Sequence, residues 1–204
     1  YHLNRGKKSI TLDLKTETGK ELYRELVRDA DAVVEAMRPG VLAKLGLGFD
    51  ELRRVNPAIV FCTVSGYGMT GPYKDMPSHG IAYDTWSGAV TPACDDEGFC
   101  YIPEHVSIGI NAAPLFGGLA VLAGVLRARE TGAGCMMELG QSDAAAFFDW
   151  YRCESYLAYA RPEDVVTGNK ADGYARRPVA TAGMKEGVRY QIYESSDGHV
   201  LFMA

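Results

Sequence analysis

Short apolar runs alternate with helical patterns through the first part of this chain, and this alternation constrains the fold more than any other feature. Patterns typical of strands fall at residues 9–14, 31–36 and 58–68. Helical patterns fall between them, at residues 18–30 and 49–57. Parallel strands need crossover connections, so this order predicts an α/β fold whose parallel sheet is covered by helices. Such sheets bind ligands at the carboxyl ends of their strands.

The second half of the chain predicts two long helices and the start of another domain. A helix is expected from about 110 to 129, ended by Gly132 or Gly134, and a strand follows at 135–139. A second amphipathic helix is expected at 142–160, with Ser142 or a neighbour as its cap. We therefore expect a large domain at residues 1–160, a polar linker at 161–188, and a hairpin that opens a small domain at 189–204, with its turn at 196–198.

Composition excludes several classes of function. The formal net charge is −5 and no long Lys/Arg run occurs, so neither a nucleic acid nor an anionic membrane surface is an expected partner. The most apolar stretch, residues 110–126, falls short of the ~18 residues that span a bilayer and predicts a buried helix. Five scattered cysteines and no disulfide framework favour a reducing, cytoplasmic location. The four histidines are dispersed, so no metal site is expected.

Several motifs, in their order along the chain, resemble a known family. They are NRGKKSITLDLKTETGKEL, RPGVLAKLGLGFDELRRVNP, SGYGMTGPY, HGIAYDTWSG and ETGAG. Together they resemble the class III CoA-transferases, the CaiB/BaiF family, which includes formyl-CoA transferase, carnitine CoA-transferase and α-methylacyl-CoA racemase. The resemblance implies a Rossmann-like large domain that binds CoA in an interlaced dimer. It also implies that this chain is a fragment that lacks the first strand-helix unit and most of the small domain.

The resemblance places CoA contacts in four short segments. The implied contacts are Leu12, Lys15, Ala36, Met37, Arg38, Lys44, Ser78 and Gly80, with His79 at the reacting end. Lys15, Arg38 and Lys44 are expected to pair with the phosphates of CoA, Arg38 in bidentate fashion. Met37 is expected to cover the adenine. The same cations are also typical of an ordinary solvated surface.

His79 has two interpretations. In the SHGIAY setting it resembles the histidine of the racemase, which moves a proton at the carbon next to the thioester, and an imidazole suits that task. The alternative is a histidine that only caps the helix predicted to follow it. Aromatic residues nearby, Tyr83 and Trp86 among them, are typical of a core as well as of an acyl tunnel.

The carboxylate nucleophile of the family is missing from its expected place. Counting back from ETGAG, that place falls at Gly109 or Ile110, and neither is an acid. Asn111 cannot act as the covalent nucleophile, and Glu104 or His105 would substitute only if the loop were shifted.

Three hypotheses of function remain. The first is an acyl-CoA:carboxylate CoA-transferase that acts on a small or medium acyl-CoA and a carboxylic acid acceptor. The second is an α-methylacyl-CoA racemase or epimerase that uses His79. The third is a non-catalytic CoA-binding subunit in a dimer with a homologous chain. No metal enters any of the three.

Overall fold

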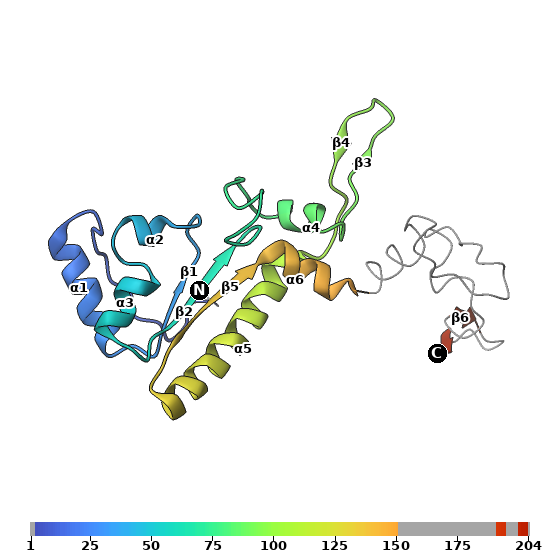
Figure 1. Cartoon of the computed structure of the whole chain (residues 1–204). Helices are drawn as coiled ribbons and strands as arrows, with labels where there is room; N and C mark the ends of the chain where they lie inside the picture. The colour runs from blue at the N-terminus through green and yellow to red at the C-terminus, as the bar shows by residue number, and fades with distance from the viewer. Residues whose placement is uncertain (1–2, 151–190, 195–199, 204) are drawn as a thin grey trace, which may run out of the picture. The chain divides into compact units, whose positions relative to one another are not determined.

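The computed structural model describes residues 3–150, 191–194 and 200–203, and divides into two compact units, Tyr1–Phe148 and Asp149–Ala204. In the first unit three parallel strands form a sheet in the order β1-β2-β5 (Figure 1). The strands are β1 (Ala32–Glu35), β2 (Val60–Ser65) and β5 (Cys135–Gly140). The parallel sheet with flanking helices confirms the predicted α/β class.

Three helices cover one face of the sheet. They are α1 (Glu17–Arg28), α2 (Val41–Lys44) and α3 (Phe49–Val55). Val33 of β1 and Phe61 of β2 are register partners on this face, and Leu52 of α3 is fully buried with them. The helix α1 begins at a side-chain cap, because the Thr16 hydroxyl accepts a hydrogen bond from the Gly19 amide at 3.1 Å. The sequence periodicity predicted helices α1 and α3 and strands β1 and β2 correctly.

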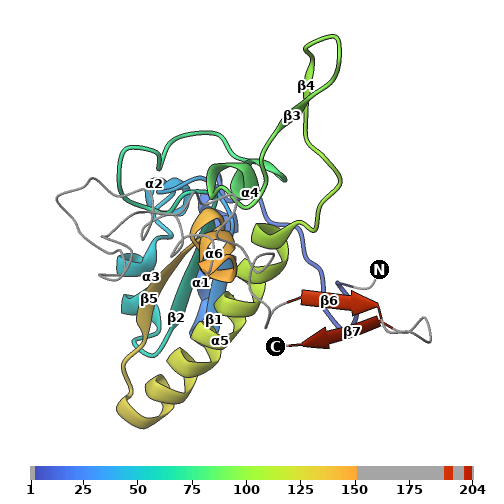
Figure 2. The same cartoon turned by 90° about the vertical axis from the view of Figure 1, so that its right-hand side faces the viewer.

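The long helix α5 (Ile108–Thr131) covers the opposite face (Figure 2). Its buried face is made of small residues: Gly109, Ala112, Ala113, Gly117, Gly124 and Ala128. The large residues point outward, since Leu115, Leu119, Leu122 and Leu126 are 63–66% exposed. The prediction of a buried helix therefore holds for one face only, because close packing on β2 and β5 selects small side chains. The predicted glycine stop is Gly132, at φ 71°.

The length of α5 corrects the expectation that this apolar stretch is too short to span a bilayer. With 24 residues and a mean hydropathy of 1.8, α5 has the length and composition of a membrane span. The sequence estimate stopped short because it began the helix at residue 110, two residues late. In this structure α5 contacts β2, β5 and α6.

Residues 9–14 do not form the predicted strand. They are irregular, and the Ile10 side chain is 63% exposed. The residues have strand-like composition, but a strand needs a neighbour for its hydrogen bonds, and β1 pairs with β2 alone among the described strands. The apolar pattern was therefore insufficient without a ladder partner.

The remaining elements connect and extend the sheet. A short helix α4 (Ala82–Trp86) leads to a hairpin of β3 (Ala93–Cys94) and β4 (Cys100–Tyr101), which projects away from the sheet (Figures 1 and 2). Helix α6 (Gln141–Phe148) begins before Ser142, so that residue lies in the first turn and not at a cap. The rest of the predicted 142–160 helix lies largely outside the described residues.

In the second unit, β6 (Gln191–Glu194) pairs antiparallel with β7 (Val200–Met203), which confirms the predicted hairpin. Its turn at 196–198 and the linker at 161–188 lie outside the described residues. The domain limits that depend on them stay predictions.

Candidate functional site

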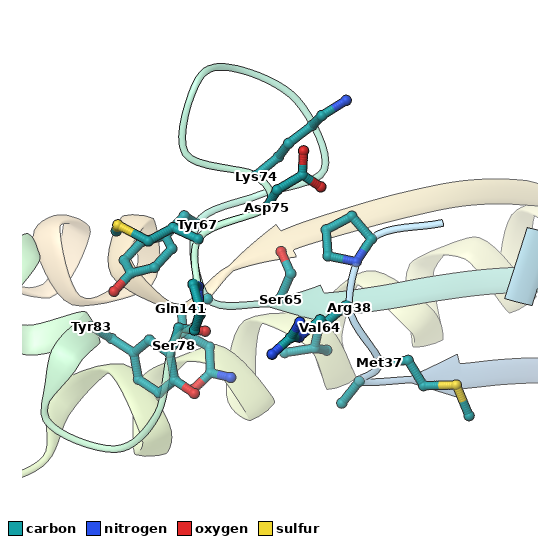
Figure 3. Close-up of a pocket in the computed structure, with 15 residues that line it drawn as sticks. Met37, Arg38, Val64, Ser65, Tyr67, Lys74, Asp75, Ser78, Tyr83 and Gln141 are labelled. Atoms are coloured by element: carbon teal, nitrogen blue, oxygen red, sulfur yellow. The ribbon is translucent and has the colours of Figure 1, made fainter. Parts of the chain in front are cut away.

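A pocket of about 160 Å³ lies at the carboxyl ends of β1 and β2, where a parallel sheet is expected to bind ligands (Figure 3). Its walls come from four regions: the turn after β1, the end of β2, the loop at 74–78, and single residues of α4 and α6. The lining residues are Ala36, Met37, Arg38, Pro39, Val64, Ser65, Gly66, Tyr67, Lys74, Asp75, Met76, Pro77, Ser78, Tyr83 and Gln141.

The turn after β1 presents Arg38 at the pocket. The Met37 amide donates to the Glu35 carboxylate at 2.8 Å, and the Val41 amide donates to the Arg38 carbonyl at 3.1 Å. These bonds fix the chain between β1 and α2. Arg38 is exposed and forms no salt bridge with any residue of the described ranges. Its guanidinium is therefore free to pair with an anion in the pocket.

A close packing contact joins the end of β2 to the loop at 74–78. A Cβ atom at Gly66 would overlap the Cβ and Oγ of Ser78 and would lie 3.1 Å from Cε1 of Tyr83. The Gly66 carbonyl accepts a hydrogen bond from the Ser142 amide at 3.0 Å. Glycine at this position thus lets three separate segments converge on one side of the pocket.

The pocket contains a buried hydroxyl without a partner. Ser65 is the last residue of β2 and is only 7% exposed, yet its Oγ atom has no hydrogen-bond partner among the residues that the structure describes. Figure 3 shows the hydroxyl leaving the end of the strand on the side of the loop that carries Asp75. Buried polar atoms normally have partners, so a ligand or a water molecule is expected beside Ser65.

Aromatic rings flank the pocket. Tyr67 lies edge-on to Trp86, with ring centroids 5.5 Å apart, and Tyr73 lies edge-on to the same indole at 4.5 Å. Burial raises the pKa of the Tyr67 hydroxyl, and the neighbouring Tyr83 adds to the effect. Tyr67 therefore stays protonated at neutral pH and remains a hydrogen-bond donor.

At Gly109, one of the two positions expected for the nucleophile, the structure has a buried hydrogen bond. Gly109 is in the first turn of α5, and its amide donates to Oδ1 of the fully buried Asp84 at 2.6 Å. A Cβ at Gly109 would lie 3.0 Å from the Gln141 carbonyl oxygen and 3.1 Å from Asp84 Oδ1. An aspartate side chain does not fit at Gly109 without rearrangement of these neighbours. Ile110, the other candidate position, is 43% exposed.

His105 lies against the same carboxylate. Its Nε2 is 3.4 Å from Asp84 Oδ2, a contact without hydrogen-bond geometry, and its Nδ1 is 3.0 Å from the Pro103 carbonyl oxygen. Both ring nitrogens thus face acceptors within the chain. In this conformation His105 offers neither nitrogen to a substrate.

The structure brings four of the predicted residues together. Ala36, Met37, Arg38 and Ser78 line the pocket, although Met37 points away from the other labelled side chains in Figure 3. The other predicted residues do not line it: Leu12 is half-buried, Lys15, Lys44 and His79 are exposed, and Gly80 has φ 53°. His79 does not cap α4 through its side chain, because only its carbonyl accepts a bond there, from the Ala82 amide. A role for these five residues in CoA binding stays a prediction.

Sequence reasoning missed several lining residues. Ser65, Gly66 and Tyr67 lie in the SGYGMTGPY motif, which carries the family resemblance but is not among the implied CoA contacts. Gln141 lacks any local signal, because it reaches the pocket only through the pairing of β5 with β2. Within the described ranges no cluster of three or more His, Cys, Asp or Glu residues could hold a metal ion.

Comparison with known proteins gives the family. A family model described as CoA-transferase family III matches residues 1–204. This chain belongs to that family. The resemblance inferred from the motifs is therefore confirmed.

Individual members of family III are similar over most of this chain. Succinate–glutarate CoA-transferase of Agrobacterium fabrum is 34% identical over 167 residues, which is 79% of this chain and 40% of that protein. The beta subunit of succinyl-CoA–L-malate CoA-transferase of Chloroflexus aurantiacus is 32% identical over 157 residues, which is 77% of this chain and 38% of that protein. The chain thus spans well under half the length of these two curated relatives.

Solved structures confirm the fold. A hypothetical protein of Mycobacterium tuberculosis superposes with a TM-score of 0.69 and 34% identity, over 78% of this chain and 45% of that one. A CaiB/BaiF family protein of Brucella suis superposes with a TM-score of 0.67 and 29% identity, over 76% of this chain and 41% of that one. The described fold is that of the CaiB/BaiF proteins.

Proposed function

We propose that this chain is the CoA-binding part of an acyl-CoA:carboxylate CoA-transferase. One observation carries the proposal: Arg38 and its two predecessors line the same pocket as Ser78, although these residues are distant in sequence. The family resemblance implies these residues as CoA contacts from the sequence alone. Their convergence supports a CoA site at the carboxyl ends of β1 and β2.

The chemistry of the pocket suits the charged and polar parts of CoA. Arg38 supplies a guanidinium that can form bidentate hydrogen bonds with a phosphate, whereas Lys74 and Asp75 in the pocket lining carry opposite charges and Lys74 points away from Arg38 (Figure 3). The Ser65 hydroxyl supplies a buried donor or acceptor that no other described residue partners. These groups support an anionic, hydrogen-bonding ligand over a purely apolar one.

The size of the pocket limits how much of CoA it holds. Sites for drug-sized ligands are typically ~300–1,000 Å³. The described residues enclose about 160 Å³. This space fits one phosphate with an adjoining segment of CoA, so the rest of the molecule would extend over the rim or against parts of the full-length protein.

For the acyl donor and the acceptor we propose small dicarboxylic acids and their CoA thioesters. Two relatives are named for such acids, one for succinate and glutarate and the other for succinyl-CoA and malate. Both are similar to this chain over more than three quarters of its length. Similarity over that part supports the same class of substrate, and the identity of the acid stays open to experiment.

A second candidate function is that of a CoA-binding subunit whose partner supplies the carboxylate. Asp84 and Gln141 crowd Gly109, and Ile110 carries no acid, so neither expected position provides a nucleophile. Relatives of both the alpha and the beta type of succinyl-CoA–L-malate CoA-transferase are similar to this chain. If one subunit binds CoA and a homologous subunit supplies the carboxylate nucleophile, a site that has Arg38 but no carboxylate at position 109 or 110 is explained.

We also propose that the protein acts in the cytoplasm as a dimer of identical or homologous chains. The leucine stripe of α5, defined by Leu115, Leu119, Leu122 and Leu126, supports a protein contact, because so much clustered apolar surface is unusual on a free molecule. Light scattering of the full-length protein tests the dimer.

A transfer assay tests both candidate functions. The full-length protein is incubated with succinyl-CoA and glutarate, and the CoA thioesters are identified by mass spectrometry. Formation of glutaryl-CoA by the isolated protein supports the transferase and contradicts the subunit hypothesis. Formation only after a homologous subunit is added supports the subunit hypothesis. No transfer in either case, with any small dicarboxylate, would contradict both.

Variants and solvent isotope make the same assay more specific. Arg38→Ala is expected to lower transfer, whereas Arg54→Ala, which removes an exposed arginine of α3 outside the pocket, is expected to leave it unchanged. In D₂O, with 2-methylacyl-CoA as substrate, deuterium entry without an acceptor acid would instead support the predicted racemase role of His79.

A further inference from the structure

Two cysteines that are separate in sequence meet on the projecting hairpin. Cys94 of β3 and Cys100 of β4 are register partners in the antiparallel pair, and their Sγ atoms lie 2.8 Å apart. Both side chains are exposed. They are six positions apart in the sequence and so form no CxxC pair.

The position of the pair in the hairpin favours a bond between them. The Asp95 amide donates to the Phe99 carbonyl at 3.0 Å, so a ladder hydrogen bond joins the residues directly next to the two cysteines. Pairs alternate along an antiparallel ladder, which makes Cys94 and Cys100 a non-hydrogen-bonded pair. Such pairs have Cα atoms ~4.5 Å apart, within the ~4.4–6.8 Å that a disulfide spans.

The turn keeps the two strands in register without help from the thiols. Oδ1 of Asp95 accepts hydrogen bonds from the amides of Glu97, at 3.0 Å, and Phe99, at 2.9 Å. Gly98 has φ 86°, a conformation that favours glycine, and its amide donates to the Asp95 carbonyl at 3.0 Å. The cysteines are therefore held together before any bond forms, and little entropy is lost when it does.

Other cysteines of the described ranges lack this arrangement. Cys62 is buried in β2, where burial raises the pKa of its thiol, and Cys135 is half-buried at the start of β5. The Sγ contact with Cys100 raises the pKa of Cys94. Asp95, Asp96 and Glu97 in the turn add negative charge nearby, so exchange is expected to be slow at neutral pH and faster as the thiols ionise.

We propose that Cys94 and Cys100 are a redox modification site that forms a reversible disulfide by exchange with a low-molecular-weight disulfide such as oxidised glutathione. One cysteine thiolate attacks a sulfur of glutathione disulfide and releases one glutathione thiolate. The second cysteine thiolate then attacks the protein sulfur of the mixed disulfide and releases the other. The two protein thiol protons leave to the solvent or to the released glutathione, and the electrons reduce one glutathione disulfide to two thiols. The hairpin between α4 and α5 is then closed covalently.

Peptide mapping tests this inference, and its outcome does not depend on CoA binding. The full-length protein is treated with oxidised glutathione, its remaining thiols are alkylated, and its peptides are identified by mass spectrometry. We expect a disulfide between Cys94 and Cys100, seen as the loss of two hydrogen atoms from the mass of the peptide. Dithiothreitol should reverse it fully. A stable glutathione adduct on either cysteine, or a link from either one to another cysteine, would overturn the proposal.

Variants separate the geometry of the hairpin from general thiol reactivity. Cys94→Ser is expected to retain glutathione on Cys100, because the resolving thiol is gone, whereas Cys135→Ser is expected to form the link as the parent protein does. Asp95→Ala removes two hydrogen bonds of the turn and is expected to slow the second exchange several-fold. An unchanged rate in Asp95→Ala would show that the hairpin does not hold the pair together and would contradict the proposed cause.

Discussion

The carboxylate of Asp84 on α4 accepts a 2.6 Å hydrogen bond from the backbone amide of Gly109, at the start of α5. Asp84 is fully buried, so it joins two elements that are 25 residues apart in sequence at a point that solvent does not reach. An acidic group at the amino end of a helix is also favoured by the helix dipole. This contact fixes the beginning of α5 beside the pocket.

Loss of this contact is expected to destabilise the fold. Asp84→Ala leaves the buried Gly109 amide without a partner, which costs about 1–3 kcal/mol of unfolding free energy. Urea denaturation measures the loss. Asp96→Ala, in the exposed hairpin turn, is the matched control and should change stability by less than about 0.5 kcal/mol. Equal stability of the two variants would show that the contact does not support the helix.

Two glycines of α5 are expected to respond differently to the same substitution. A Cβ at Gly118 would meet no atom within 4 Å, so Gly118→Ala should stabilise the protein by up to about 1 kcal/mol through helix propensity. A Cβ at Gly124 would collide with Cε of Met137 and lie 3.0 Å from Cγ1 of Val60. Gly124→Ala should therefore be less stable than Gly118→Ala by about 1–3 kcal/mol.

Thermal and urea unfolding of the two glycine variants give the sign directly. If Gly124→Ala were as stable as Gly118→Ala, α5 would not pack on β2 and β5 as closely as described. Both substitutions add the same methyl group to the same helix, so the difference between them reports packing alone.

Alkaline pH is expected to destabilise the protein through Cys62. Burial raises the pKa of this thiol above its ordinary value of 9.0, and the nearby Glu35 adds to the rise. The folded state thus holds the proton more tightly than the unfolded chain, so this contribution is present below pH 9.0 and is lost as pH rises above it. The unfolding free energy should fall more steeply above pH 9.0 in the parent protein than in Cys62→Ala. Parallel pH profiles would contradict this account.

The local patterns of the sequence predicted those parts of the fold that depend on local periodicity. Spacing of apolar residues gave α1, α3 and β2, and the order of elements gave the parallel sheet and the strand end where the pocket lies. Residues 9–14 show the limit of this reasoning. Their pattern was strand-like, but a strand also needs a partner, which no local pattern reports.

Contacts between distant segments could not be predicted from the sequence in the same way. The bond of Asp84 to Gly109 and the approach of Gln141 to the pocket depend on how α4, α5 and β5 are placed by the whole sheet. The pairing of Cys94 with Cys100 did leave a signal. Two cysteines flank a short turn that contains Asp95 and Gly98, which is typical of a hairpin.

Isothermal titration of CoA into the full-length protein tests the central claim most directly. We predict saturable binding to the parent protein and to Arg54→Ala. In Arg38→Ala the dissociation constant should rise by about tenfold or more, because a charge-assisted hydrogen bond to phosphate contributes ~1.5–3 kcal/mol. No binding to the parent protein, or equal binding to Arg38→Ala, would contradict a CoA site at the ends of β1 and β2.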